Sequence, residues 1–390
     1  MNVIPIISKF SEYLLPEHAH TMLRSLYRSL RGERNDETEV NLVDWGVYLE
    51  DPRMDQRLRD MLSEFIKEEH EEAVTSTYWS VLCRKNVAQL LDKGYENFKQ
   101  TVALNYFTWI VDRMDPQAVF LQNSLPPEDV KLAQKRAAES QPHAFITKKQ
   151  SEFYNLLTYL LWNYTEKIVG LEVMARLSEP DEGNPLSVKL AGRNISQDLA
   201  NSVLEYYSVS QGLPNMQSLK SIIEVGGGYG RTAYAFLRLL PKIRYVLVDI
   251  PPALYIAERY IAGQFTDRKI FRYRPFRNFS EVADEFNEAR IAFLMPDQLS
   301  LLPDRSADLF LAIDCLHEMR PEQIKRYYET VNRLSDSFYQ KCWKKTKIPY
   351  DDITLTQDDY PFPSNWQNLF FQDCRVQTTY FEAMFNIIRS

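Results

Sequence analysis

The amino-acid sequence predicts an α/β fold in the second half of the chain and a helical first half. From residue 221 onward, short apolar runs rich in β-branched residues alternate with segments that have the apolar spacing of amphipathic helices. A glycine-rich turn joins the first apolar run to the first of these helices. A chain of 390 residues is long enough for two domains. We place a helical N-terminal domain at 1–180 and an α/β domain at 181–390.

The first half is helical by pattern and poor in glycine. Apolar residues recur three and four positions apart near 56–94, 98–113 and 150–177. Proline and glycine then interrupt this pattern. A new helix is expected to begin near Gln197, with the Ser196 side chain as its N-cap.

The first apolar run, 222–225, leads into the glycine turn and then into a helix that should begin at Arg231 and end before Pro241. Glycine lets the backbone approach a ligand closely, and the N-terminus of a helix carries a partial positive charge. A strand, a glycine turn and a helix in this order are typical of the opening unit of a nucleotide-binding α/β fold.

Two kinds of nucleotide-binding loop are excluded by the residues that follow the turn. A Walker loop needs a lysine before its Ser or Thr, whereas this turn ends in Gly230-Arg231-Thr232. A dinucleotide fingerprint needs a small third residue, and Arg231 occupies that position. The pattern that fits is an acid followed by alternating glycines, namely Glu224, Gly226, Gly228 and Gly230.

This pattern resembles the first motif of the class I S-adenosylmethionine-dependent methyltransferases. The resemblance implies that the three glycines pass under the methionine part of the cofactor. It also implies that Glu224 lies near the cofactor's amino group and sulfonium. S-adenosylmethionine is cationic at sulfur and carries no pyrophosphate, so an acid beside the loop is favourable. The family further implies a Rossmann-like sheet of seven strands that closes with an antiparallel hairpin.

The second apolar run, 244–250, contains an acid near its end. Asp249 follows the glycine loop at about the offset, roughly 20 residues, at which an acid meets ribose hydroxyls in such folds. The resemblance therefore assigns Asp249 and its neighbour Ile250 to the cofactor. The alternative is that Asp249 caps the helix that Pro252 opens.

Two further runs end beside polar residues. The run 291–295 precedes Asp297 and Gln298, which the resemblance assigns to the exocyclic amine of adenine; an ordinary polar loop is the alternative. The run 307–314 ends at Asp314, which is a further candidate for the cofactor. Four strands that alternate with helices, each followed by a suitable residue, predict the methyltransferase core.

The rest of the chain fits the same pattern. A helix is expected at 321–334 and a fifth strand at 337–343, followed by a polar insertion at 344–363. Apolar segments around 369–376 and 380–388 would form the closing hairpin. Loops at strand ends usually carry function, so the insertion is a candidate wall of the acceptor pocket.

More specific motifs resemble the bacterial sugar O-methyltransferases over roughly 150–390. They are Glu179-Pro180, Gly183-Asn184-Pro185, Ile195 to Asn201, Asp249 to Ala253, His317-Glu318-Met319 and Phe381-Glu382-Ala383. The resemblance implies transfer of a methyl group to a hydroxyl of a sugar or glycoconjugate, so the partner would be a small-molecule or glycan acceptor. The first 150 residues resemble no family.

A hydroxyl becomes a good nucleophile when a positioned base removes its proton. His317 follows the fourth strand, and its ordinary pKa, near 6.5, suits a base. The alternatives for His317 are a cap of the next helix or packing against Met319. Asp314 and Glu318 could orient the imidazole or serve as the base instead.

The segment before the first strand could lie over the cofactor pocket, where Asn184, Arg193 and Gln197 would contact the substrate. A simple hinge is the alternative. Arginines between 268 and 277 could bind phosphate, or form a solvated surface or an oligomer contact.

Composition limits the class of function. The net charge of −7, without a basic domain, argues against nucleic acid as a partner. The four cysteines have no zinc spacing, and Asp297 and Asp314 alone do not define a metal site, so no metal is expected. No apolar stretch is long enough to span a membrane, and no signal peptide is evident, so we expect a cytoplasmic protein.

Three other functions stay open. A polyketide-type or other small-molecule O-methyltransferase would share every motif. A non-catalytic binding protein on the same fold would bind the cofactor without turnover. A nicotinamide oxidoreductase is disfavoured by Arg231 and Glu224. A homo-oligomer is compatible with all of them.

Overall fold

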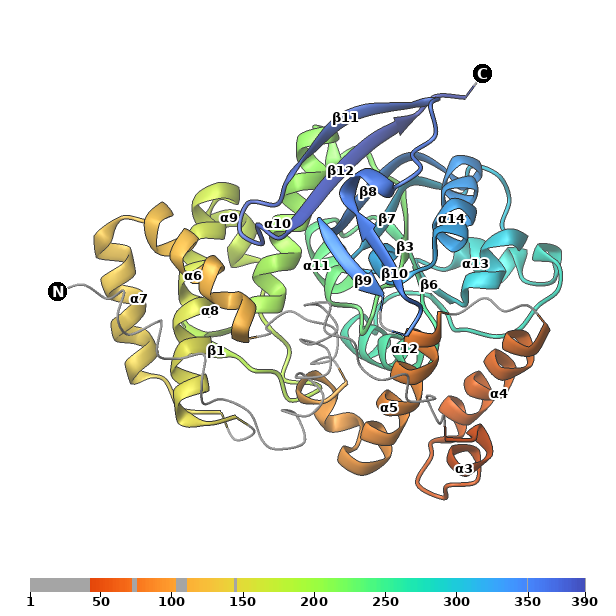
Figure 1. The fold of residues 1–390 in the computed structure, drawn as a ribbon, viewed down its shortest axis with the longest axis horizontal. Helices are drawn as coiled ribbons and strands as arrows, with labels where there is room; N and C mark the ends of the chain where they lie inside the picture. Colours follow the sequence, from red (N-terminus) through yellow and green to blue (C-terminus); the bar gives the residue numbers. More distant parts are fainter. Residues whose placement is uncertain (1–42, 72–75, 103–110, 144–145, 349, 390) are drawn as a thin grey trace.

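A computed structural model describes residues 43–71, 76–102, 111–143, 146–348 and 350–389. Its centre is an eight-stranded sheet with the order β11-β12-β8-β7-β3-β4-β6-β5 (Figure 1). The strands are β3 Ser221–Val225, β4 Arg244–Val248, β5 Ile270–Phe271, β6 Ile291–Leu294, β7 Ala307–Ile313, β8 Ser335–Trp343, β11 Trp366–Asp373 and β12 Tyr380–Ile387. Every strand predicted from the second half of the sequence is therefore confirmed to within a few residues.

The strands β5, β6, β4, β3, β7 and β8 run parallel, whereas β12 is antiparallel to both of its neighbours, β8 and β11. Numbered along the chain, β6-β4-β3-β7-β8 has the order 3-2-1-4-5 of a doubly wound nucleotide-binding sheet. The order reverses between β3 and β7, and ligands of such sheets bind outside the carboxyl ends of the strands at this point. The antiparallel β11–β12 pair is the closing hairpin that the sequence predicted.

The predicted count of seven strands is one too few. The additional strand is β5, which pairs with the edge strand β6 through Ile270 and Phe271. Two residues are too few to produce an alternating pattern, so no sequence signal marks this strand.

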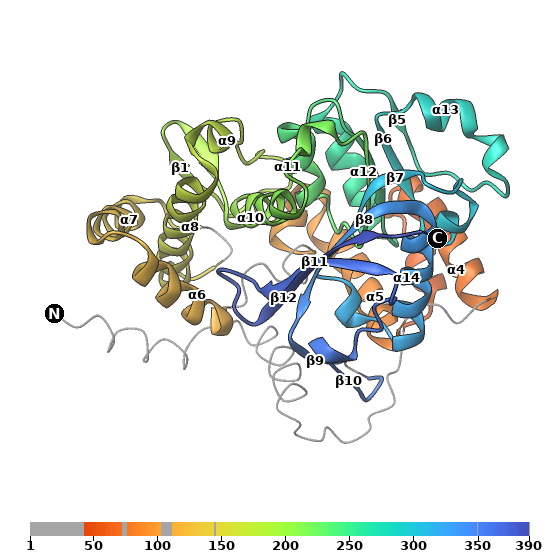
Figure 2. The ribbon, with the colours of Figure 1, turned by 90° about the horizontal axis from the view of Figure 1, so that it is seen from above.

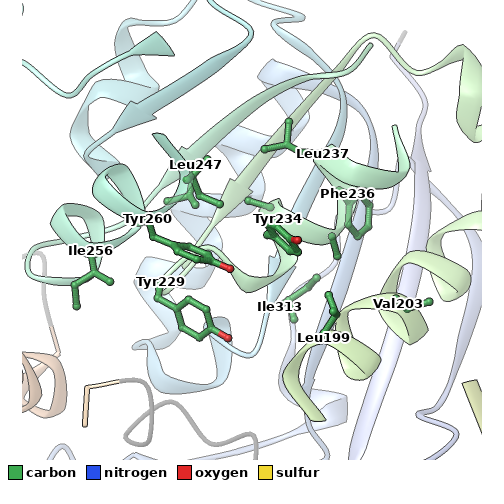
Figure 3. Packing of buried hydrophobic residues seen from close by; sticks show 14 of the residues in the cluster. Leu199, Val203, Tyr229, Tyr234, Phe236, Leu237, Leu247, Ile256, Tyr260 and Ile313 are labelled. Atoms are coloured by element: carbon green, nitrogen blue, oxygen red, sulfur yellow. The ribbon is translucent and has the colours of Figure 1, made fainter. Parts of the chain in front are cut away.

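Helices cover both faces of the sheet. One face carries α10 Gln197–Gly212, α11 Arg231–Leu239 and α12 Ala253–Gln264; the other carries α13 Ala283–Glu288 and α14 Pro321–Leu334. Alternate residues of β7 divide between the two cores, with Leu309 and Leu311 on the α10 side and Phe310 and Ala312 on the α14 side. Figure 3 shows part of the α10 side, where Tyr229, Tyr234 and Tyr260 pack beside Leu247.

The helices described before residue 180 form two groups rather than one bundle. The first contains α3 Trp45–Leu49, α4 Gln56–Glu71 and α5 Thr77–Lys93, and the second contains α6 Val111–Ser124, α7 Pro127–Glu139, α8 Lys148–Val169 and α9 Leu171–Ala175. Figures 1 and 2 show the groups at opposite ends of the molecule, the first beside α12 and the second beside α10. Both groups contribute to the hydrophobic core on the α10 side of the sheet.

Helices are confirmed within 56–94 and 150–177, while residues 103–110 of the predicted segment 98–113 lie outside the described part. No helix in the described ranges is both long enough and apolar enough to cross a membrane.

Two short hairpins lie in segments for which the sequence predicted loops. They are β1 Val188–Leu190 with β2 Arg193–Ile195, and β9 Lys345–Ile348 with β10 Ile353–Thr356. The helix α10 follows β2 and begins as predicted, because the Ser196 Oγ accepts a hydrogen bond from the Leu199 amide at 3.1 Å.

A buried lysine fixes the first group of helices to the glycine turn. Lys99, in the 3₁₀ helix Tyr95–Gln100, donates to the Glu179 Oε1 at 2.5 Å and lies 4.4 Å from the ring centroid of Tyr260. The neighbouring Phe98 packs on Tyr229, which lies within the turn, at 5.4 Å between ring centroids. Both charges of the pair are almost fully buried.

We expect Lys99→Met to destabilise the fold strongly, because it leaves the Glu179 carboxylate buried without its cation. Removal of one partner of a buried pair costs about 3–5 kcal/mol. Lys93→Met, which breaks the exposed pair with Asp92, should cost less than about 1 kcal/mol. Denaturant unfolding of both variants measures the difference. Equal costs would mean that the buried pair does not fix the helices to the turn.

Candidate functional site

Of the three alternating glycines in the turn after β3, packing requires two, and the third faces open space. All three alternating glycines have positive φ, at +69° for Gly226, +57° for Gly228 and +91° for Gly230. A Cβ atom on Gly226 would lie 2.4 Å from the Cβ of Cys315, and one on Gly230 would lie 2.8 Å from Ile261. A Cβ on Gly228 would meet no atom within 4 Å. A ligand can therefore approach the backbone at Gly228.

Asp249, just past the end of β4, shapes this turn. Its two carboxyl oxygens accept hydrogen bonds from the amides of Gly228 and Ile250, both at 2.7 Å. Burial raises the pKa of Asp249 to about 7, although both backbone hydrogen bonds oppose the shift. Each carboxyl oxygen has a second lone pair, so Asp249 can still accept hydrogen bonds from ligand hydroxyls.

Glu224 lies near the end of β3 and faces the α10 side of the sheet. It is buried, and its Oε2 accepts a hydrogen bond from the hydroxyl of Tyr245 at 2.8 Å. Burial raises the pKa of Glu224 to about 7, and repulsion from Asp249 contributes to the shift. The two acids that the sequence singled out are thus close enough to interact.

A buried network of four charged residues lies next to these acids. Glu205 of α10 pairs with Arg231 at 2.7 Å and with Lys341 of β8 at 2.8 Å. The Asp314 Oδ2 lies 3.3 Å from Arg231 and 3.4 Å from Lys341. We call Glu205, Arg231, Asp314 and Lys341 the buried ion network.

The buried ion network contacts only one carboxyl oxygen of Asp314, Oδ2. Burial would raise the pKa of Glu205, but the charges of Arg231 and Lys341 outweigh it and hold the value at about 2. For Asp314, burial is the stronger influence and raises the pKa. Its Oδ1 is buried and has no hydrogen-bond partner among the described residues. Asp314 also has a positive φ of 58°, an uncommon conformation that directs the chain away from the end of β7.

Glu205 and Lys341 were not predicted as site residues. Lys341 is the one basic residue within the largely buried strand β8, and this is the only signal that the sequence offers. The partners of the network are distant in sequence, so no local motif joins them.

His317 and Glu318 lie in a short 3₁₀ helix after β7. The His317 Nε2 is 3.7 Å from the Glu318 Oε1, which is too long for a hydrogen bond. The imidazole packs against Trp343 and Tyr380, with ring centroids 5.9 and 6.4 Å away. The histidine does not cap α14, because Arg320 is the residue before that helix.

Glu318 connects the site to the first group of helices. Burial raises its pKa well above the ordinary value, and the charges of Asp314 and Asp249 add to the shift. Its backbone oxygen accepts a hydrogen bond from the hydroxyl of Ser76, the N-cap of α5, at 3.1 Å. Helix α5 therefore starts at the carboxyl edge of the sheet.

Two residues predicted for the site, Gln298 and Arg193, make side-chain hydrogen bonds to the backbone. Both polar atoms of the Gln298 side chain make hydrogen bonds: Oε1 accepts from the Met295 amide, and Nε2 donates to the Arg274 carbonyl. Arg193 donates to the carbonyls of Met174 and Leu177. These contacts give both side chains a structural role.

The other residues predicted to contact the substrate or the adenine are Asn184, Asp297 and Gln197, and their surroundings differ. The Asn184 Nδ2 donates to the Asn97 Oδ1 at 2.9 Å, and Asp297 is exposed in the turn after β6. Gln197 differs from them, since it is fully buried and neither amide atom has a hydrogen-bond partner within the described ranges.

The basic segment 268–277 makes intramolecular contacts. Lys269 pairs with Glu288, Arg272 with Glu258 and Arg274 with Glu285, while Arg268 donates to the Leu237 carbonyl. These contacts favour the surface interpretation over a phosphate site. In the parts of the chain that the structure describes, no three His, Cys, Asp or Glu residues are grouped to hold a metal ion.

The site contains more carboxyls than basic groups, since Arg231 and Lys341 are accompanied by Glu205, Glu224, Asp249, Asp314 and Glu318. The pKa values of Glu224, Asp249, Asp314 and Glu318 are all raised, with burial as the main cause. No basic group contributes to the shift of Asp249 or of Glu318. A cationic ligand would stabilise the ionised forms of these carboxyls, whereas a pyrophosphate would be repelled by them.

We expect Glu224 to make folding stability depend on pH. Its pKa is 4.5 in the unfolded chain and about 7 in the fold, so the folded state binds more protons between these values. The free energy of unfolding should therefore fall by on the order of 3 kcal/mol as pH rises from 5 to 8. Glu224→Gln still accepts from Tyr245 but cannot ionise, so this contribution should disappear.

Denaturant unfolding of the wild type and of Glu224→Gln at pH 5 and pH 8 measures the effect. Glu329→Gln, which alters an exposed carboxyl, is the control and should keep the pH dependence of the wild type. An unchanged pH dependence in Glu224→Gln would contradict the assignment.

No protein-family model matches the chain, and no curated protein matches it. Among solved structures, the PH0226 protein of Pyrococcus horikoshii OT3 is similar at 14% identity and a TM-score of 0.32, with 47% of this chain and 91% of that protein covered. An S-adenosylmethionine-dependent methyltransferase of Clostridium acetobutylicum ATCC 824 is similar at 13% identity and a TM-score of 0.34, with 48% and 92% covered. The CcbJ methyltransferase of Streptomyces caelestis is similar at 12% identity and a TM-score of 0.30, with 46% and 88% covered. At these TM-scores the likeness carries no conclusion about function, and the fold assignment rests on the order and direction of the strands.

Proposed function

We propose that this protein is an S-adenosylmethionine-dependent O-methyltransferase whose acceptor is a hydroxyl of a sugar or glycoconjugate. The observation that carries the proposal is the glycine turn at the switch point between β3 and β7. The turn is open at Gly228 and is surrounded by carboxyls with raised pKa values. This combination suits a cationic nucleoside derivative without a pyrophosphate and disfavours a nicotinamide dinucleotide.

The residues that would hold the cofactor follow from this arrangement. The backbone at Gly228 would lie against the cofactor, and Asp249, beside the turn, would accept the ribose hydroxyls. Glu224 and Asp314 would balance its positive charge from the carboxyl ends of β3 and β7. When bound, S-adenosylmethionine would supply an electrophilic methyl group on its sulfonium.

His317 would act as the base that takes the proton of the acceptor hydroxyl on a ring nitrogen. Its imidazole is buried, so water competes little for the proton, and Glu318 beside it can stabilise the imidazolium. Trp343 and Tyr380 pack against the imidazole and limit its rotation. Aromatic rings of this kind also suit the apolar faces of sugars, which supports a sugar acceptor.

We expect Gly228→Ala to abolish binding of S-adenosylhomocysteine, the product of the cofactor. The added methyl group would project into the open space at the turn. Gly192→Ala is a matched control, because Gly192 also has positive φ and open space but lies in the turn between β1 and β2. Each substitution should cost about 1–2 kcal/mol of stability, and only Gly228→Ala should lose binding.

Calorimetric titration with S-adenosylhomocysteine and, separately, with NADH tests the cofactor assignment. Binding of NADH alone to the wild-type protein would overturn the proposal. If Gly228→Ala and Gly192→Ala both bound S-adenosylhomocysteine like the wild type, the turn would not be the cofactor site.

We expect His317→Ala to lower the rate constant of methyl transfer about 10²–10⁴-fold and to leave S-adenosylhomocysteine affinity unchanged. His143→Ala is the control, since His143 bonds to Asn155 of α8, in the second group of helices, and should leave the rate unchanged. Release of S-adenosylhomocysteine with an acceptor found by screening sugars and glycoconjugates measures the rate. A wild-type rate in His317→Ala would remove this residue as the base.

A further inference from the structure

A small cavity lies beside the buried ion network, one strand farther along the sheet than Asp314. It has a volume of about 30 Å³ and lies between α10, β8, β12 and the turn at 374–377. Its polar and charged lining consists of Asn201, Glu205, Ser208, Lys341, Arg375, Gln377 and Glu382, and the other lining residues are Leu204, Cys374 and Val376. The volume corresponds to about one water molecule's share of liquid, which is enough for one hydroxyl-bearing group but not for a sugar ring.

One side chain in this wall has a polar group that the protein does not satisfy. Asn201 is 2% exposed, and its Nδ2 has no hydrogen-bond partner in the described part of the chain. A buried amide without a hydrogen-bond partner lowers the stability of a fold by about as much as the loss of one hydrogen bond. Gln197 lies on the same face of α10, one helical turn earlier. Its side-chain amide also has no hydrogen-bond partner in the described part of the chain. Two such groups on one face indicate a surface that a ligand completes.

The formal charges that line the cavity balance, since the acids Glu205 and Glu382 are matched in number by the bases Lys341 and Arg375. Lys341 bonds to Glu205 at 2.8 Å, and Glu205 also pairs with Arg231. Glu382 accepts hydrogen bonds from Tyr339 and Gln372, both at 2.8 Å. A carboxylate, phosphate or amine in the cavity would find no net opposite charge. A neutral hydroxyl would find the donor Nδ2 of Asn201.

The cavity is connected to the proposed catalytic residues through the sheet. Lys341 is paired with Ile313, the last residue of β7, and so lies level with Asp314. Tyr380 and Glu382 of β12 pair with Trp343 and Lys341 of β8, so the aromatic pair beside His317 and the cavity wall lie on the same face. An acceptor that reached His317 could place a second group in the cavity.

We propose that this cavity is the anchoring pocket of the acceptor and that it takes a neutral hydroxyl group, held by Asn201. This inference rests on the proposed methyltransferase function. It explains why the resting fold retains an unsatisfied amide at Asn201: the hydrogen bond is made when the acceptor binds.

The test combines stability with binding in two asparagine variants. Asn201→Leu removes the unsatisfied amide, so its melting temperature should equal or exceed that of the wild type, while binding of the acceptor should weaken at least about tenfold. Asn155→Leu is the matched control. Asn155 is equally buried but bonds to His143 at 2.8 Å, so this variant should melt lower and bind like the wild type. Ser208→Leu, which fills the cavity from another position, should reproduce the loss of binding.

The probes are methyl glycosides of glucose, mannose and rhamnose, with glucose 6-phosphate and glucosamine as charged counterparts. Saturation-transfer NMR with the protein saturated by S-adenosylhomocysteine measures their binding. We expect a neutral glycoside to bind the wild type and Asn155→Leu, but neither Asn201→Leu nor Ser208→Leu.

Three results would overturn the anchoring pocket: preference for a charged probe, no binding of any probe, or wild-type binding in Asn201→Leu. A lower melting temperature of Asn201→Leu would also contradict it, since that result means that the amide is satisfied within the fold. Failure of S-adenosylhomocysteine to bind the wild type is a separate outcome, which overturns the proposed function itself.

Discussion

The buried ion network is the constraint on which the rest of the site depends. Its four members come from four elements: Glu205 from α10, Arg231 from the start of α11, Asp314 from the end of β7 and Lys341 from β8. Burial of these charges is favourable only while all of them remain paired. The network therefore fixes α10 on the sheet, and through Arg231 it also fixes the helix that follows the glycine turn. The network holds Asp314 by one carboxyl oxygen, and the other has no hydrogen-bond partner among the described residues.

The helices of the first half support this arrangement from two directions. The group α3–α5 reaches the site through Ser76, which bonds to the Glu318 backbone, and through Lys99, which is buried against Tyr260 beside the glycine turn. The group α6–α9 packs on α10, which carries Glu205. The division at residue 180 stays a prediction, but the two groups share one hydrophobic core with the sheet. The first half therefore belongs to the structural support of the site.

The sequence was sufficient for the elements whose signal is local. Strands β3, β4, β6 and β7 are largely apolar runs, and α14 was predicted at its observed bounds because proline opens it and its apolar residues have helical spacing. The glycine turn and Asp249 were also recognisable, since one short segment determines each. Glu205 and Lys341 could not be found in this way, because their roles arise only when the sheet brings residues 136 positions apart within 2.8 Å. Arg193 and Gln298 lie near motifs in sequence, but the sequence did not reveal that their side chains bond to the backbone.

The insertion of β12 between β8 and β11 has a consequence for the time at which the two halves of the site form. The proposed cofactor side consists of residues within 221–318, whereas the cavity wall also needs Glu382 and the turn at 374–377, which come later in the sequence. During synthesis the chain emerges from its N-terminus, and folding begins before later residues are made. The proposed cofactor side can therefore assemble first. The proposed acceptor side closes only when β12 inserts into the sheet, so a chain without residues 374–387 would retain the glycine turn but lack the wall beside Lys341.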